Sequence, residues 1–86
     1  MALPPRRRSK PRSPEHAALG EAVRQLRLER ELSQEQLAER ASTDLTQIGG
    51  IERGVRNPSY TTLVRLAAAL ETSVGEIASL ADQLRE

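Results

Sequence analysis

The fold of this chain is decided by residues 33–58, SQEQLAERASTDLTQIGGIERGVRNP. Gln34 opens the stretch, and the small Ala38 follows four residues later. Ile48 and Ile51 lie 14 and 17 residues after Gln34. This spacing predicts two short helices that are joined by a tight turn and cross over an apolar contact, while one face of the second helix stays free. A free helix of this kind fits the major groove of DNA, so the stretch predicts a helix-turn-helix.

The composition limits the rest of the fold to one small helical domain. The chain has 86 residues, of which 37% are hydrophobic, with no Phe, no Trp and one Tyr. The core must therefore be built from Leu, Ile, Val and Ala, which suits a helical bundle with a modest stability margin. The absence of cysteine excludes disulfides and thiolate metal sites. No apolar stretch reaches the length of a membrane span, and the N-terminus lacks the apolar segment of a signal peptide.

Charge is distributed unevenly along the chain. The net charge is only +1, yet residues 1–14 hold five basic residues and no acid, whereas the remainder holds eight Arg against twelve acids. Dense positive charge and three prolines predict that residues 1–13 form a disordered or extended arm. This arm either wraps onto DNA or serves as a solubilising tail, and the sequence favours neither. Its basic residues are Arg6, Arg7, Arg8, Lys10 and Arg12.

Capping residues divide residues 14–86 into five predicted helices, with no strands. Each helix is expected to begin at a serine or an aspartate that caps its first turn. Two of these caps belong to capping boxes, Ser33-x-x-Gln36 and Ser73-x-x-Glu76. Gly54 is expected to end the third helix. The expected helices are residues 14–30, residues 33–41, residues 45–53, one after Ser59 and one after Ser73.

Four segments occur in an order and spacing that carry a family resemblance: LG with VRxLR in residues 19–27, LSQExLA in residues 32–38, IERGxRNPS in residues 51–59 and LxxLAxAL in residues 63–70. In these segments the chain resembles the Cro and phage-repressor type of helix-turn-helix regulator. The resemblance implies an all-α, lambda-repressor-like five-helix bundle over residues 14–86. It also implies a protein that binds operators as a symmetric dimer.

The resemblance implies a DNA-binding site around the second and third helices. Gln34 matches a family glutamine that contacts a phosphate, as helix N-termini favour. The family reads base edges with the start of the third helix; Thr46 can bond a base edge and Gln47 could pair with adenine. The implied base-reading residues are Leu45, Thr46, Gln47 and Gly50, and the implied phosphate-binding residues are Gln34, Arg53, Arg56 and Asn57.

Departures from the family pattern weaken the predicted base readout. Ser42 and Glu31 stand where glycine is usual, so each is expected in a left-handed conformation that costs about 1–2 kcal/mol. Gly49 and Gly50 lie inside the third helix, where each glycine costs roughly 0.8–1 kcal/mol relative to alanine. Leu45 and Gly50 also occupy positions that often carry polar readers. One hypothesis, from side-chain size alone, is that Gly50 lets the backbone approach the groove closely.

Two further features follow from the resemblance. Arg27 and Glu52 match a family salt bridge, so we expect their charged groups within ion-pair distance. The last helix has more apolar positions than one buried stripe needs, and the family pairs at this end of the fold. We therefore expect a homodimer, and the candidate seam residues are Ile77, Leu80, Ala81 and Leu84.

The residues favour one function class over another. The leading hypothesis is a sequence-specific regulator of transcription on double-stranded DNA, in the cytoplasm at the nucleoid, with residues 45–53 in the major groove. A restriction–modification controller, an antitoxin and a free-standing repressor all fit it. The alternative is a protein-interaction module that keeps the fold with weak or no DNA reading, as the double glycine and the acidic body suggest. His16 is the only histidine and no catalytic or ligand-binding constellation occurs, so we expect no enzyme activity, metal, cofactor or small-molecule ligand.

Overall fold

A serine or an aspartate caps the start of each helix in the part of the chain that the structure describes. Every cap has an extended backbone, and its side chain accepts a hydrogen bond from the backbone N–H three residues later. The caps Ser13, Ser33, Asp44, Ser59 and Ser73 begin α1 (Pro14–Glu29), α2 (Gln34–Arg40), α3 (Leu45–Glu52), α4 (Tyr60–Ala69) and α5 (Val74–Arg85). The predicted helix starts are confirmed.

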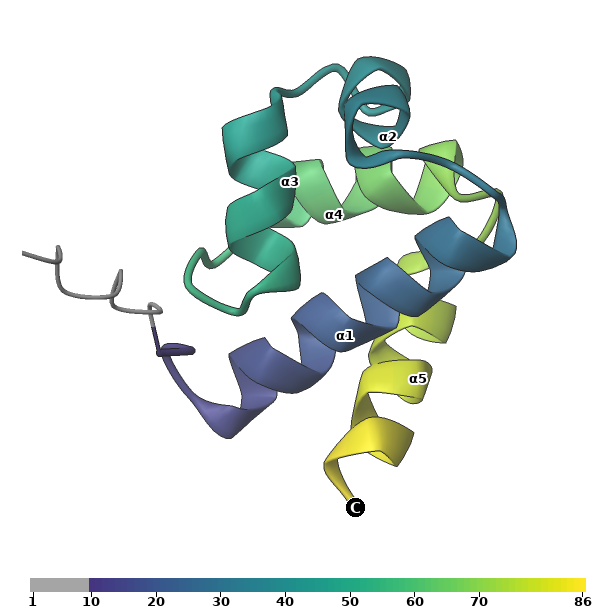
Figure 1. Cartoon of the computed structure of the whole chain (residues 1–86). Coiled ribbons are helices and arrows are strands. Elements are labelled where there is room, and N and C mark those ends of the chain that lie inside the picture. Colours follow the sequence, from purple (N-terminus) through teal and green to yellow (C-terminus); the bar gives the residue numbers. More distant parts are fainter. Residues whose placement is uncertain (1–9) are drawn as a thin grey trace, which may run out of the picture.

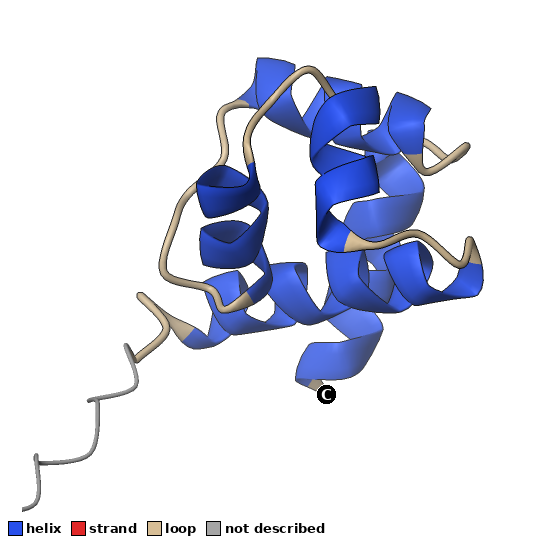
Figure 2. Cartoon of the chain, turned by 45° about the horizontal axis from the view of Figure 1, so that its top comes forward, coloured by secondary structure: helices blue, strands red, loops and turns tan. Residues whose placement is uncertain are grey.

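The computed structural model describes residues 10–86, and within this range it contains five helices and no strand (Figures 1 and 2). Three of the basic arm residues, Arg6, Arg7 and Arg8, lie outside the described residues. None of the described helices combines the length and the apolar character that crossing a membrane requires.

The two predicted capping boxes differ in the structure. The Ser33 box is complete, because Ser33 N–H donates to Gln36 Oε1 at 2.8 Å while Gln36 N–H donates to Ser33 Oγ at 3.0 Å. At α5 the Ser73 hydroxyl accepts from Glu76 N–H, but the Glu76 carboxylate accepts from the Thr72 hydroxyl instead of the cap backbone. The second box was therefore wrong in its reciprocal half, because a neighbouring hydroxyl competes for the same carboxylate.

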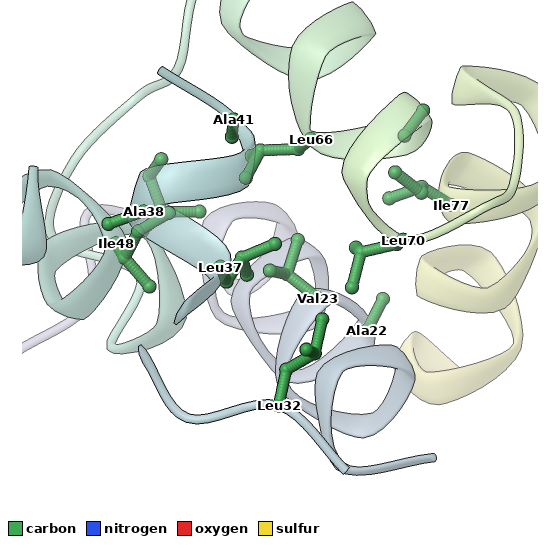
Figure 3. Packing of buried hydrophobic residues seen from close by; sticks show 12 residues of the cluster. Ala22, Val23, Leu32, Leu37, Ala38, Ala41, Ile48, Leu66, Leu70 and Ile77 are labelled. Carbon is green, nitrogen blue, oxygen red and sulfur yellow. The ribbon is translucent and has the colours of Figure 1, made fainter. Parts of the chain in front are cut away.

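The helices pack around an aliphatic core. α1 contacts α5 along one side and α3 on the other, while α2 contacts α3 and α4 (Figure 1). Figure 3 shows side chains of the first four helices and of α5 meeting in this core. Its largest fully buried side chains are Val23, Leu37, Ile48, Ile51, Leu66, Leu70 and Ile77. The predicted Leu, Ile, Val and Ala core is thus what the fold contains.

Gly20 permits the close crossing of α1 and α3. A Cβ atom added at Gly20 would lie 2.3 Å from the carbonyl oxygen of Ile51 and 2.5 Å from that of Glu52. Both atoms belong to the backbone of α3, so they cannot turn away. The absence of a side chain at this position therefore sets how closely α1 supports the C-terminal end of α3.

The apolar face of α5 packs partly against the protein's own core. Ile77 is fully buried, and Leu80 and Ala81 pack against the same core cluster. Of the four predicted seam residues only Leu84 is exposed. Ile77, Leu80 and Ala81 thus contribute to the protein's own core, and the dimer seam stays a prediction.

Candidate nucleic-acid interface

The turn between α2 and α3 has the strained conformation that the sequence predicts. Ser42 has a φ of 55°, in the left-handed region, where a non-glycine residue is disfavoured. Its N–H donates to the Glu39 carbonyl, and Thr43 N–H donates to the Ala38 carbonyl, which closes the end of α2. Asp44 then caps α3. The strained turn thus directs α3 across α2.

A buried ion pair joins α1 to the end of α3. Arg27 Nε donates to Glu52 Oε2 at 2.7 Å and Arg27 Nη2 donates to Glu52 Oε1 at 3.0 Å. The two side chains are only 11% and 4% exposed. The hydrogen bonds to Glu52 raise the pKa of Arg27 above its ordinary value. The charged groups therefore lie within the ion-pair distance that the family resemblance implies.

The same carboxylate orients Gln34 at the start of α2. Gln34 Nε2 donates to Glu52 Oε1 at 3.0 Å. An amide nitrogen carries two hydrogens, so one remains for another acceptor. Glu52 accordingly links the helix that carries the predicted phosphate contact to the helix that carries the predicted base readers.

The N-terminal face of α3 is accessible. Leu45 is 45% exposed and Thr46 is exposed, while Gln47 is half-buried. These three predicted base readers lie in the first turn of α3, beside the Asp44 cap. The structure thus brings them together on one end of the helix. Their contact with bases stays a prediction.

Gly50 does not belong to this accessible face. It is buried, and the side chain of Arg56 lies over it: a Cβ atom at Gly50 would come within 2.6 Å of Arg56 Cγ and Cδ. The hypothesis that the Gly50 backbone approaches the groove stays a prediction, and the structure gives a second reason for the glycine. Gly50 makes room for an arginine that the loop after α3 folds back onto the helix.

Gly49 makes room for a second arginine. A Cβ atom there would lie 2.9 Å from Arg53 Nη1. The predicted phosphate-binding residues Arg53, Arg56 and Asn57 are all exposed, and they follow one another closely around the end of α3. The two glycines thus leave space for the two cations that flank the predicted reading face.

One contact at this surface was missed by sequence reasoning. Arg56 Nη1 donates to Gln47 Oε1 at 3.2 Å, across nine residues of chain. No local sequence pattern predicts this contact, because it depends on the path of the loop after α3. The arm also begins here: Arg12 N–H donates to the Gly54 carbonyl at 2.8 Å. Within the described residues, no group of three His, Asp or Glu could hold a metal ion.

Two crossing helices with an exposed N-terminal face on the second, and arginines around its end, define a helix-turn-helix DNA-binding protein. Comparison with known proteins agrees, because a helix-turn-helix family model matches residues 23–77. The chain belongs to this helix-turn-helix family, which is of the Cro and phage-repressor type.

The relatives of this chain include controllers and a repressor. It is 49% identical over 59 residues to control protein C.SmaI of Serratia marcescens, spanning 69% of this chain and 70% of that protein. It is 41% identical over 59 residues to the immunity repressor protein of Bacillus phage phi105, spanning 69% of this chain and 41% of the repressor.

Solved structures share the fold. The restriction-modification controller protein C.AhdI from Aeromonas hydrophila matches with a TM-score of 0.74 and 37% identity, over 76% of this chain and 98% of that one. The controller C.Esp1396I, solved as a tetramer with its natural 35-base-pair operator, matches with a TM-score of 0.77 and 29% identity, over 85% and 96%.

Proposed function

We propose that this protein is a sequence-specific regulator of transcription that inserts the N-terminal half of α3 into the major groove of double-stranded DNA. The observation that carries this proposal is the accessible first turn of α3, with Leu45 and Thr46 exposed and Gln47 half-buried, and with Arg53 and Arg56 on the same helix and the loop after it. Base edges are read in the grooves, while phosphate contacts fix register and orientation. The protein would act at the nucleoid in the cytoplasm, as a binding protein and not as an enzyme.

Phosphate contacts are assigned to both sides of the reading face. Arg53, Arg56 and Asn57 follow α3, and Gln34 opens α2 with one amide hydrogen still available. Contacts at two points on the backbone would hold α3 at a defined depth and angle in the groove. This arrangement supports a fixed register and thereby sequence-specific reading.

A homodimer on a two-fold operator is the favoured assembly. The relative C.Esp1396I binds its operator as a tetramer. In this chain Ile77 of α5 is buried and Leu80 and Ala81 are half-buried, whereas α4 exposes Tyr60 (72%) and Val64 (43%), which are one helical turn apart. We assign the pairing surface to this face of α4. Half-sites would then lie about 34–36 Å apart, one turn of DNA.

Sedimentation at micromolar concentration tests this assembly. Val64→Asp should shift the protein from dimer to monomer, because a charge would be desolvated in the seam. Leu28→Asp is the matched control, since Leu28 is 49% exposed on α1, and it should leave the mass unchanged. A wild-type protein that sediments as a monomer contradicts the dimer.

Binding-site selection on random duplex DNA, repeated over a salt series, tests the function itself. The expected result is a palindromic consensus with two half-sites. Binding without sequence preference, or no binding, contradicts the proposal and favours the alternative interaction module. That alternative has lost one of its two supports, because the double glycine now accommodates Arg53 and Arg56.

A further inference from the structure

Arg56 is tied to α3 at three points. Its backbone N–H and that of Val55 donate to the Gly50 carbonyl, at 3.2 and 2.9 Å. Its aliphatic stem lies over Gly50, where any Cβ atom would collide with it. Its guanidinium donates to Gln47 Oε1 at 3.2 Å. The loop after α3 therefore returns a charged side chain to the same face that carries Gln47.

This contact sets the polarity of the Gln47 amide. A guanidinium has only donors, so the amide must present its oxygen to Arg56 and its NH2 group elsewhere. A donor group of a base that approached the same Gln47 oxygen would also approach the positively charged guanidinium of Arg56. This repulsion disfavours a second hydrogen bond to the oxygen. The two side chains together therefore present mainly hydrogen-bond donors, since Arg56 already uses one of the two lone pairs of the amide oxygen.

We infer that Gln47 and Arg56 act as one reading unit that selects guanine in the major groove, which moves Arg56 from the phosphate contacts to the base contacts. Guanine presents two acceptors, N7 and O6, whereas adenine and cytosine each present an amino donor and thymine offers one acceptor beside a methyl group. Pairing of glutamine with adenine needs the amide oxygen to accept from the adenine amino group, and here that oxygen already accepts from the charged Arg56. This inference rests on the proposed function and specifies which base the α3 face recognises.

Gly50 is a positioning residue in this unit. It touches no base, but it leaves the space in which the stem of Arg56 lies. Gly50→Ala should displace Arg56 and release the Gln47 amide. Gly49→Ala is a matched control, because the added Cβ atom would meet only the mobile end of Arg53. Both variants replace a helical glycine with the best helix former, so a general effect of helix propensity is shared.

The test compares the affinities of duplexes in which each base pair of the selected half-site is changed in turn. We expect one guanine that wild type prefers roughly 5- to 150-fold over other bases. Gln47→Ala, Arg56→Ala and Gly50→Ala should each remove this preference, and the Gln47/Arg56 double variant should lose no more than either single variant. Replacing that guanine with 7-deazaguanine, which lacks N7, should weaken wild type but not the variants. Gly49→Ala should keep the preference.

Several results would overturn the inference. One is that Gln47→Ala removes a preference for adenine, while Arg56→Ala lowers the affinity for all duplexes equally. The second effect is that of a plain phosphate contact. Another is a double variant whose fold loss of guanine preference equals the product of the fold losses in the two single variants. Both results leave the proposed function intact, whereas a wild type without any base preference overturns the proposed function and this inference with it.

Discussion

At the residue scale, Glu52 joins three parts of the fold through one carboxylate. It accepts hydrogen bonds from Arg27 on α1 and from Gln34 on α2, while it is itself part of α3. Arg27 in turn donates to the Leu32 carbonyl at 2.9 Å, in the loop before α2. A buried charge that loses its partner is costly, so this pair should be an essential part of the native state.

Glu52→Leu should therefore destabilise the protein by about 3 kcal/mol, because Arg27 would stay buried without a counter-charge. The measurement is the free energy of unfolding from urea titration. Arg27→Met combined with Glu52→Leu should recover most of the loss, since an apolar pair leaves no unpaired charge.

The exposed pair Arg24–Glu21 provides the control. Its side chains are 51% and 44% exposed at an N–O distance of 3.5 Å. Glu21→Gln should change the free energy of unfolding by no more than about 0.5 kcal/mol. If Glu52→Leu proved as mild as Glu21→Gln, Glu52 would not have the role described.

Gly20 gives a second residue-scale prediction. Gly20→Ala should destabilise by about 1–3 kcal/mol, because the new Cβ atom forces α1 away from two backbone carbonyls of α3. Gly75→Ala is the counterpart, since only Ser73 Oγ lies near it, at 3.8 Å, and it should stabilise by up to about 1 kcal/mol. Thermal unfolding followed by circular dichroism measures both. Equal effects of the two substitutions would show that the close crossing of α1 and α3 is not required.

At the element scale, four of the described helices end in the same motif although only one of them has glycine there. In each case the residue after the C-cap has a positive φ, and its N–H and the following N–H bond back into the last turn. Gly54 ends α3 in this way without strain, whereas Glu31, Ser42 and Glu71 adopt the same conformation with side chains.

Replacing one of the strained residues should stabilise the fold. Glu71→Gly is the clearest case, because Glu71 follows α4, away from the predicted DNA contacts. It should raise the free energy of unfolding by about 1 kcal/mol through removal of left-handed strain. Gly54→Ala should lower it, since Gly54 has a φ of 77° and its Cβ would lie 3.0 Å from the Ala17 backbone. Chemical denaturation measures the free energy of unfolding of both variants. If Glu71→Gly lowered this free energy, Glu71 would not be strained.

The helices could be predicted from the sequence better than the contacts between them. The reason is that helix signals act over a few neighbouring residues, whereas contacts depend on residues far apart in the chain. Caps act within three residues, so Ser13, Ser33 and Asp44 could be recognised from sequence. The role of Gly50 depends on Arg56, whose position is set by a loop. The face of α5 could not be assigned either, because Ile77 is apolar whether it faces the core or a second copy. Arg27 and Glu52 were predicted only through the family resemblance.

At the scale of the whole molecule, the basic arm begins at the C-terminal end of α3, beside the arginines that are predicted to bind phosphate. The Arg12–Gly54 hydrogen bond places the root of the arm next to the end of α3. Eleven residues can span at most about 40 Å from that root, which is more than one turn of DNA. We therefore propose that the arm contacts phosphates as well.

Arg7→Gln with Arg8→Gln should reduce the salt dependence of operator binding. Each phosphate contact that is lost lowers the slope of log affinity against log salt by about 0.9. Arg24→Gln with Arg85→Gln removes the same charge from exposed positions on α1 and α5 and should leave the slope unchanged. A slope that both pairs leave at the wild-type value would show that the arm is only a solubilising tail.

The proposed function requires the accessible face of α3 to read a DNA sequence. The most direct test is the ratio of dissociation constants for a selected operator and for a shuffled duplex of the same composition, measured by fluorescence anisotropy at about 0.15 M salt. We predict a ratio of about a thousandfold or more for wild type, which falls when Thr46 and Gln47 are replaced by alanine. Equal affinity of the wild-type protein for the two duplexes would contradict the account.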